Sequence, residues 1–463
     1  MVNSQELGVR SKIKKRAAAT FHDDEYNVRH VGKPGAPMKT RTVSLATSVA
    51  VLSSCFLSAT CLASEDGKGV LAPAQIAQSA QPAPAPAAWQ DTIKFSGQVE
   101  AGITGNPAGP RNDLNFGHLM TDRANDPLLN QLLLTAERPL DPKATGYDFG
   151  FKLQGMYGAD ARYTHFLGEL DRTTSARNQW DIVEANATAH LPWLTDGGID
   201  AKLGQYSTPL GSEVIDARGN FFYSHSYIFN FGLPFKHTGV LTTTHVNSMV
   251  DVWAGVDTGV NTSLGNLGDN NTAPAGLAGF GLNLLDGKVT VLALSHFGPE
   301  NARSVPEHNS AFRYLNDVMV IWKVNDKLTS TTEINYIRDD HFGATAKGIA
   351  QYLTYAINDQ VSVGGRAEVY RDDDSFFVAA FPSNRDFVDA ERGLTNTSFT
   401  GGRTTYGALT LGLNYKPAVP KPIEGFVIRP ELRYDSSLNG TRPFDDGTGK
   451  HQFTAAADFV LPF

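Results

Sequence analysis

The sequence contains only two cysteines, and both lie near its amino terminus. Cys55 and Cys61 fall within a segment that has the features of an export signal. A chain matured by cleavage after Ala63 would therefore contain no cysteine at all. Such a chain forms no disulfide and offers no thiolate, which excludes cysteine-based chemistry and fits a protein that crosses the periplasm.

Long apolar runs and a surplus of basic residues are also missing beyond residue 63. No run there is long enough for a membrane-spanning helix, which argues against a helical membrane protein. From Ser64 onward, 31 basic residues face 44 acidic ones, a net charge of -13. Because nucleic-acid binding relies on basic surface, this balance argues against a nucleic-acid partner.

Three common catalytic signatures are absent: the Gly-x-Ser-x-Gly elbow, the His-Glu-x-x-His zinc motif and the Walker loop. A triad can be written from Asp216, His225, Ser226 and His237, but closeness in sequence gives no geometry. We therefore expect no enzyme, no cofactor and no metal site. An outer-membrane barrel enzyme stays open as a competing class.

The amino-terminal part is predicted to be a leader, residues 1–63, in which translation starts at Met38. A short basic stretch, an uncharged apolar stretch and a small-x-small site ending at Ala63 follow, which is the anatomy of a cleavable signal peptide. A lipoprotein signal that modifies Cys55 and an uncleaved membrane anchor stay open as alternatives. Residues 64–88 are rich in Ala, Pro and Gln, and this composition predicts a disordered periplasmic spacer.

Residues 89–463 are predicted to form one all-β domain, because strand-like segments near ten residues long follow one another from Ile93 to the end. Tilted transmembrane strands have this length. The sixteen predicted strands are 93–103, 130–138, 147–158, 181–191, 199–206, 237–245, 249–257, 276–285, 288–297, 315–324, 328–338, 347–357, 361–370, 405–415, 426–434 and 452–463.

The connections alternate between tight turns and long loops. Turn residues that tolerate positive φ occur at every second junction, as in Asp286-Gly287 and Asn325-Asp326, while the other junctions are mostly long. An outer-membrane barrel sorts its connections in this way, with short turns in the periplasm and long loops outside. We therefore predict a closed antiparallel transmembrane β-barrel of about 16 strands, within a range of 14–18.

The alternation of apolar and polar side chains predicts a water-filled lumen. In 361–370, an outward set of Val, Val, Gly, Ala and Val alternates with Ser, Gly, Arg, Glu and Tyr, and in 426–434 an apolar set alternates with Arg429, Glu431 and Arg433. Pro430 interrupts this pattern, and because proline donates no ladder hydrogen bond it predicts a bulge or a strand end. The chain closes on an alternating apolar strand that ends at Phe463, which resembles the signal read by the barrel-assembly machinery.

The stretch from Ile199 to Thr244 carries the most informative motifs. Two strand-like runs enclose the loop 207–236, which is too long for a hairpin turn and mixes both charge signs with many aromatic residues. Its Pro209-Leu-Gly-Ser-Glu213 motif, Asn220, Ser224 and the run Gly232-Leu-Pro-Phe-Lys-His-Thr-Gly239 resemble the putative beta-barrel porin-2, OmpL-like, family. The resemblance implies a closed outer-membrane barrel and passive diffusion of small solutes, but no particular solute.

In sixteen-stranded porins the third external loop folds into the barrel, and 207–236 takes that place by strand count. Charges of both signs across a narrow water path sort solutes by charge and size. We therefore predict a pore constriction formed by Glu213, Asp216, Arg218 and Lys236. The predicted lumen wall comprises Arg366, Glu368, Arg429, Glu431 and Arg433. The alternative that a residue is only a solvated lumen or loop position, with no role in selectivity, stays open for each of them.

Two further features have two interpretations each. The aromatic residues from Phe221 to Phe235 fit either a sugar-stacking track or the packing of an in-folded loop, and we favour packing. The acidic runs 372–374 and 445–446 suggest divalent cations that bridge lipopolysaccharide, but they lack the spacing of a calcium loop, so we favour solvated external loops.

The sequence thus predicts an outer-membrane porin of a Gram-negative bacterium. Its expected partners are outer-membrane lipid and lipopolysaccharide, the assembly machinery through Phe463, and small hydrophilic solutes. A plugged structural or adhesion barrel is the second alternative, and monomer and homotrimer both stay open.

Overall fold

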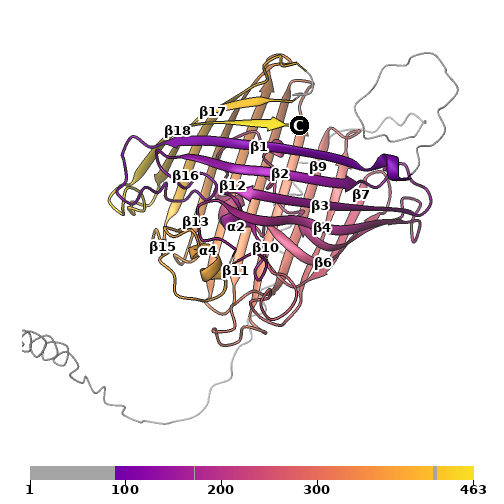
Figure 1. Ribbon diagram of the computed structural model, residues 1–463, viewed down its shortest axis with the longest axis horizontal. Coiled ribbons are helices and arrows are strands. Elements are labelled where there is room, and N and C mark those ends of the chain that lie inside the picture. Colours follow the sequence, from indigo (N-terminus) through magenta and orange to yellow (C-terminus); the bar gives the residue numbers. More distant parts are fainter. Residues whose placement is uncertain (1–88, 172, 421–424) are drawn as a thin grey trace, which may run out of the picture. The chain divides into compact units, whose positions relative to one another are not determined.

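Sixteen antiparallel strands close into one β-barrel in the computed structural model, which describes residues 89–171, 173–420 and 425–463 (Figure 1). The predicted leader and spacer lie outside the described residues. The barrel strands are β1 (Lys94–Gly105), β2 (Pro127–Arg138), β3 (Asp148–Gly158), β4 (Gln179–Leu191), β5 (Ile199–Ser207), β6 (Lys236–His245), β7 (Val250–Asp257), β8 (Ala275–Leu284), β9 (Val289–Pro299), β10 (Phe312–Lys323), β11 (Leu328–Asp339), β12 (Ala344–Ala356), β13 (Val361–Asp372), β16 (Thr405–Tyr415), β17 (Val427–Ser437) and β18 (His451–Pro462).

Each barrel strand pairs with its neighbours along the chain, and β18 returns to β1 to close the sheet. Gln98 lies opposite Pro462 in that seam, and Gly105 lies opposite Ala455. Closure removes both free edges, so the backbone groups of the strands are paired as a membrane interior requires. The predicted sixteen-stranded all-β barrel is confirmed. Strands β2, β10 and β12 begin a few residues before their predicted starts.

Short elements fill the loops. The two-residue strands β14 (Ala379–Ala380) and β15 (Phe399–Thr400) pair with each other between β13 and β16. The helical turns are η2 (Trp89–Thr92), α2 (Ala161–Thr164), η3 (Ala217–Gly219), α3 (Tyr227–Phe231) and α4 (Asp386–Glu391). Among the described residues, no helix has the length and apolar character needed to cross a membrane.

Asparagine closes three of the tight turns by the same local mechanism. The side-chain oxygens of Asn247, Asn325 and Asn358 each accept two backbone N–H groups from the residues two and three places further on. Asp286, between β8 and β9, takes the left-handed conformation with φ of 56°. The alternation of turns and loops has exceptions on both sides. On the loop side β11 and β12 are joined by only 340–343, and on the turn side 139–147 and 416–426 are longer than tight turns.

The prediction of a bulge or strand end at Pro430 is wrong. Strand β17 runs through it, and Pro430 lies opposite Ala457 of β18 without a register shift. On the other side, Gly412 pairs with Glu431 and Tyr415 with Ile428, so the register to β16 is also unchanged around the proline. The strand therefore accommodates the missing N–H by losing the two pairs to β16 that would involve residues 429 and 430, without a register shift.

The two faces of the barrel differ as the alternation predicts. Outward residues of β13 and β17 are apolar and exposed, with Val369 at 42% and Leu432 at 51% exposure. The inward Arg366, Arg429 and Arg433 are buried. An apolar belt outside and charged groups inside are the arrangement of a transmembrane barrel with a polar lumen.

Candidate functional site

The loop between β5 and β6, residues 208–235, lies against the inner wall of the barrel; we call it the inner segment. Its neck is closed by a backbone hydrogen bond of 2.9 Å from Thr208 N to the Phe235 carbonyl. Asp216 caps η3 by accepting from Arg218 N, and Ser226 caps α3 by accepting from Phe229 N. These side chains order the segment locally because they satisfy N–H groups that a helix end leaves free.

Two wall carboxylates bind the backbone of the inner segment. Glu368 of β13 accepts from Tyr227 N at 2.7 Å. Glu431 of β17 accepts from Tyr223 N at 3.0 Å and from Ser224 N at 3.2 Å. Hydrogen bonds to an ionised acceptor are about twice as strong as neutral ones, so these contacts fix the middle of the segment.

Three wall arginines bind its carbonyl groups. Arg366 donates to the Ser224 carbonyl at 2.7 Å, and Arg433 donates to the His225 carbonyl at 2.7 Å. Arg429 donates to two carbonyl groups, those of residues 217 and 220, each at 2.9 Å. All five predicted wall residues therefore contact the inner segment, and we call them the wall clasp.

The four residues predicted for the constriction separate into three places. Glu213 accepts from Arg366 at 2.7 Å and from Ser226 N at 2.8 Å, so it joins the wall clasp. Asp216 and Arg218 pair with each other at 2.6 Å at a partly exposed position.

Lys236 does not join that set. It begins β6, and its Nζ donates to Asp181 of β4 at 2.6 Å and to the Ile182 carbonyl at 2.9 Å. Its side chain is fully buried. The structure thus makes Lys236 a link between two strands at the neck of the inner segment.

Electrostatics distinguish the buried clasp from the exposed pair. Burial alone would raise the pKa of Asp216, but the hydrogen bonds and charge of Arg218 hold it below its ordinary value. The clasp is enclosed, with Arg366 at 0% and Glu431 at 5% exposure. Enclosed charges need partners on every side, because desolvation costs several kcal/mol per ion.

Further carboxylates supply those partners. Arg429 also pairs with Glu100 at 2.7 Å and with Asp458, and Arg433 pairs with Asp435 at 2.8 Å. These three acids come from β1, β17 and β18, and the site prediction did not include them. Alternation could have indicated them, since Asp458 shares the inward face of its predicted strand with Ala456 and Val460.

Aromatic residues of the inner segment pack against the wall. Tyr227 stacks between Tyr370 of β13 and Tyr406 of β16, with ring centroids 6.1 and 4.9 Å apart. Phe222 and Phe229 are also buried, in two apolar clusters. This arrangement is the packing that we favoured over a sugar-stacking track.

Toward the turn side of the inner segment, the inner wall is polar and partly exposed. By alternation, the inward positions there include Lys152, Lys202 and Lys323 on one part of the wall and Thr329 and Ser362 on another. Partly exposed polar positions on a barrel interior indicate water. Solvent therefore reaches these inward side chains, and we call the space that they line on the turn side the vestibule.

Other sequence candidates have ordinary structural partners. Asp372 accepts backbone N–H groups of residues 376–378, Asp373 pairs with Lys347, and Asp446 accepts from the backbone of 111 and 112. The residues of the possible catalytic triad also have other partners. Asp216 pairs with Arg218, and Ser226 accepts from Phe229 N, as described above. His237 bonds to Thr208.

The model of the family described as putative beta-barrel porin-2, OmpL-like, matches residues 92–463 of this chain. The chain belongs to this family. The protein is accordingly an outer-membrane porin, and both the predicted family and the predicted location are confirmed. The matched range contains the entire barrel and the wall clasp.

Solved structures share the porin's fold at low sequence identity. OprB of Pseudomonas putida, in a high-pH structure, has a TM-score of 0.51 and 13% identity, covering 81% of this chain and 95% of its own. OmpF of Salmonella typhi, in complex with daunomycin, has a TM-score of 0.51 and 9% identity, covering 81% and 99%. A comparison with curated protein sequences finds no match.

Proposed function

We propose that the porin lets small hydrophilic solutes diffuse passively across the outer membrane, through a lumen that the inner segment narrows. The observation that carries this proposal is the wall clasp. Five charged wall residues hold residues 217–227 by hydrogen bonds, and the polar vestibule lies on the turn side of the held segment. A fixed obstruction above a polar vestibule sorts solutes by size without coupling to energy.

We further propose that Asp216 and Arg218 give the narrow region its local field. Their side chains are 26% and 37% exposed, whereas Glu213 and the clasp are enclosed. Solutes would therefore meet the charges of this pair rather than those of the clasp. The charges of the clasp instead hold the inner segment in its position.

Liposome swelling with neutral sugars of increasing mass tests the size limit. The test variant lacks residues 211–232, a deletion that joins two nearby ends, because Gly211 and Leu233 lie in contact at the neck. We expect larger sugars to enter faster through this variant than through the full barrel. If both barrels admit the same sugars at the same rates, the inner segment does not set the limit.

We also propose three partners for the barrel. Phe463 is 58% exposed, and its backbone pairs with Gly97, so its ring is accessible to the assembly machinery. Loss of folded barrel from the outer membrane on deletion of Phe463 would support that role. Lipopolysaccharide at the loops and a homotrimer remain proposals, for native mass spectrometry to test. No site for catalysis is proposed.

A further inference from the structure

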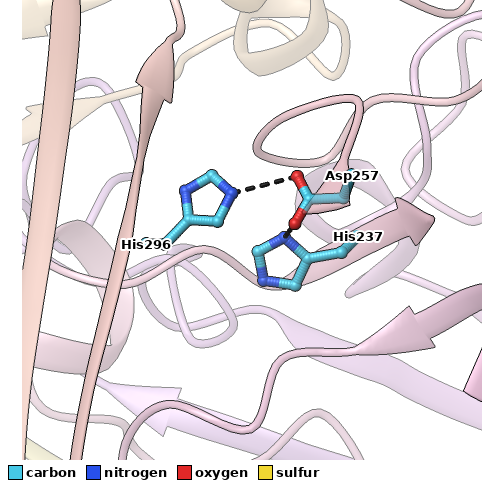
Figure 2. Close-up of side chains that lie close together, drawn as sticks. All are labelled: His237, Asp257 and His296. Carbon is cyan, nitrogen blue, oxygen red and sulfur yellow. Dashed lines mark hydrogen bonds and ion pairs between the residues drawn. The ribbon is translucent and has the colours of Figure 1, made fainter. Parts of the chain in front are cut away.

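A cluster of two histidines and an aspartate lies at the end of the barrel that carries the long loops (Figure 2). His237 comes from the start of β6, Asp257 from the end of β7 and His296 from β9. One donor atom from each residue lies within 4.8 Å of the others. Three strands that are not all neighbours thus bring metal-ligating side chains to one point.

The cluster is enclosed. His237 and His296 have no exposed surface, and Asp257 is 4% exposed. His237 Nδ1 lies 3.4 Å from one Asp257 oxygen, and His296 Nε2 lies 3.0 Å from the other. Donor atoms that share a tetrahedral metal ion at 2.0–2.1 Å are ~3.3 Å apart. Both separations are close to that spacing, although they involve different oxygens of Asp257, and the 3.0 Å contact is a hydrogen bond that a bound ion would replace.

Several atoms at this point have no hydrogen-bond partner. They are His237 Nδ1, Asp257 Oδ2, His296 Nδ1 and Glu300 Oε1. Glu300 directly follows β9 and is 4% exposed, with Oε1 3.7 Å from His296 Nδ1. Buried polar atoms almost always have partners, so a group of orphan donors and acceptors indicates a ligand.

The charge of the cluster also calls for a cation. Within the described ranges, Asp257 and Glu300 form ion pairs with histidines only, and neither pairs with a lysine or arginine. Two buried carboxyl groups without a lysine or arginine partner need another source of positive charge when they ionise, because an unpaired charge is costly in an enclosed site. A divalent cation or a proton on a histidine would supply the missing charge.

Surrounding contacts already hold the ligands in place. Thr208 Oγ1 lies 3.1 Å from His237 Nε2, Gly259 N donates to Asp257 Oδ1 at 2.8 Å, and Val260 N donates to Glu300 Oε2 at 2.8 Å. Metal sites are built in this way, with outer partners that orient the ligands. Thr208 also belongs to the neck of the inner segment.

We propose that His237, Asp257 and His296 bind one divalent transition-metal ion, with the Glu300 carboxylate beside them. Two imidazoles and one carboxylate suit zinc and its neighbours in the first transition row, whereas calcium and magnesium prefer all-oxygen sites. The bound ion joins β6, β7 and β9 beside the neck of the inner segment.

The test measures zinc in the full barrel, refolded with Zn²⁺ and dialysed against buffer. We expect one tightly held equivalent, and binding more than tenfold weaker in H237A and in H296A, since even loss of an outer-shell partner weakens sites by roughly 10–100-fold. H245A is the matched control, because His245 also contacts two aspartates but is partly exposed. Its binding should equal that of the unmodified barrel.

Two readouts keep the proposal open to refutation if a variant fails to fold. Co²⁺ should give the visible absorption of a four- or five-coordinate nitrogen and oxygen site in the unmodified barrel. Zn²⁺ should raise its unfolding midpoint and leave that of H237A/H296A unchanged. Absence of saturable binding by the unmodified barrel, or loss of the zinc in H245A instead, would overturn the proposal. Neither readout involves conductance, so the result is independent of the proposed transport.

Discussion

Arg366 connects the clasp to the inner segment at several points. Its guanidinium pairs with Glu213 of the inner segment and Glu368 of its own strand, and it donates to the carbonyl and hydroxyl of Ser224. With no exposed surface, it has no water to replace these partners. Arg366 therefore connects the wall to the segment through both charge and backbone contacts.

Substitution R366M is expected to lower the free energy of unfolding by about 3–5 kcal/mol, because it leaves the enclosed Glu213 without its cationic partner, whereas Glu368 keeps Arg433 at 3.4 Å. Urea titration of the folded barrel in micelles measures this change. R338M is the matched control, since Arg338 is half exposed and pairs with Asp340 on the surface, where an ion pair contributes about 0–1 kcal/mol. Equal losses in both variants would contradict the buried role of Arg366.

Glu391, at the end of α4, gives the barrel a pH dependence. Burial raises the pKa of its carboxyl from 4.5 to about 8; the Asn261 hydrogen bond and the charges of Arg313 and Arg392 lower it, while Asp171 raises it. A raised carboxyl pKa contributes stability that is present below about pH 4.5 and is lost as the pH rises through about 8.

Substitution E391Q mimics the protonated acid and should remove that loss. We expect the stability of E391Q relative to the unmodified barrel to increase between pH 5 and pH 9, measured by urea titration at both values. E307Q serves as the control, because the Glu307 side chain is 70% exposed. A relative stability of E391Q that does not change with pH would show that Glu391 does not titrate in this way.

At the scale of elements, the inner segment is held by the wall from both sides of its backbone. Carboxylates of β13 and β17 accept its N–H groups, and arginines of the same strands bind its carbonyl groups. An irregular segment inside a barrel carries many unpaired backbone groups, and each costs free energy when enclosed. The wall clasp provides partners for these groups, which is why the segment holds its place.

The reactivity of an introduced cysteine tests whether the wall holds the inner segment in place, because the described part of the chain contains no cysteine. In A217C the thiol replaces a buried methyl group, and it should react slowly with a membrane-impermeant maleimide. Adding R429A should speed the reaction by about tenfold or more, since the carbonyl groups of residues 217 and 220 lose their charged donor. In V214C the thiol is exposed, so its rate should not change between backgrounds. Unchanged labelling of A217C would mean that other contacts hold the segment.

Strand positions could be predicted from the sequence because the lipid and the lumen impose opposite polarity on alternate residues. For this reason the sequence alone predicted the inward positions of Arg366 and Arg429 and the asparagines of the turns. The partners of those charges were not predicted, because Glu100 of β1 approaches Arg429 only when the barrel closes, and Asp458 faces Arg429 through the register between β17 and β18, which the side-chain pattern does not specify. Lys236 was assigned to the constriction on chain proximity, yet its partner Asp181 lies on another strand.

At the scale of the whole molecule, the barrel divides into two levels. On one level the inner segment lies against the wall, with buried aromatic rings and enclosed ion pairs. On the turn side, partly exposed polar residues line the wall. If the proposal is correct, passage is limited at the level of the inner segment only, and the size limit should depend on that segment rather than on the strands.

Single-channel conductance in planar bilayers tests this account most directly. The full barrel from Ser64 is compared with the variant that lacks residues 211–232, after both show the heat-modifiable migration of a folded barrel. We predict steady conductance from the full barrel and a larger conductance from the deletion variant. Equal conductance from the two would contradict a lumen narrowed by the inner segment, and no conductance from either would contradict transport through this barrel.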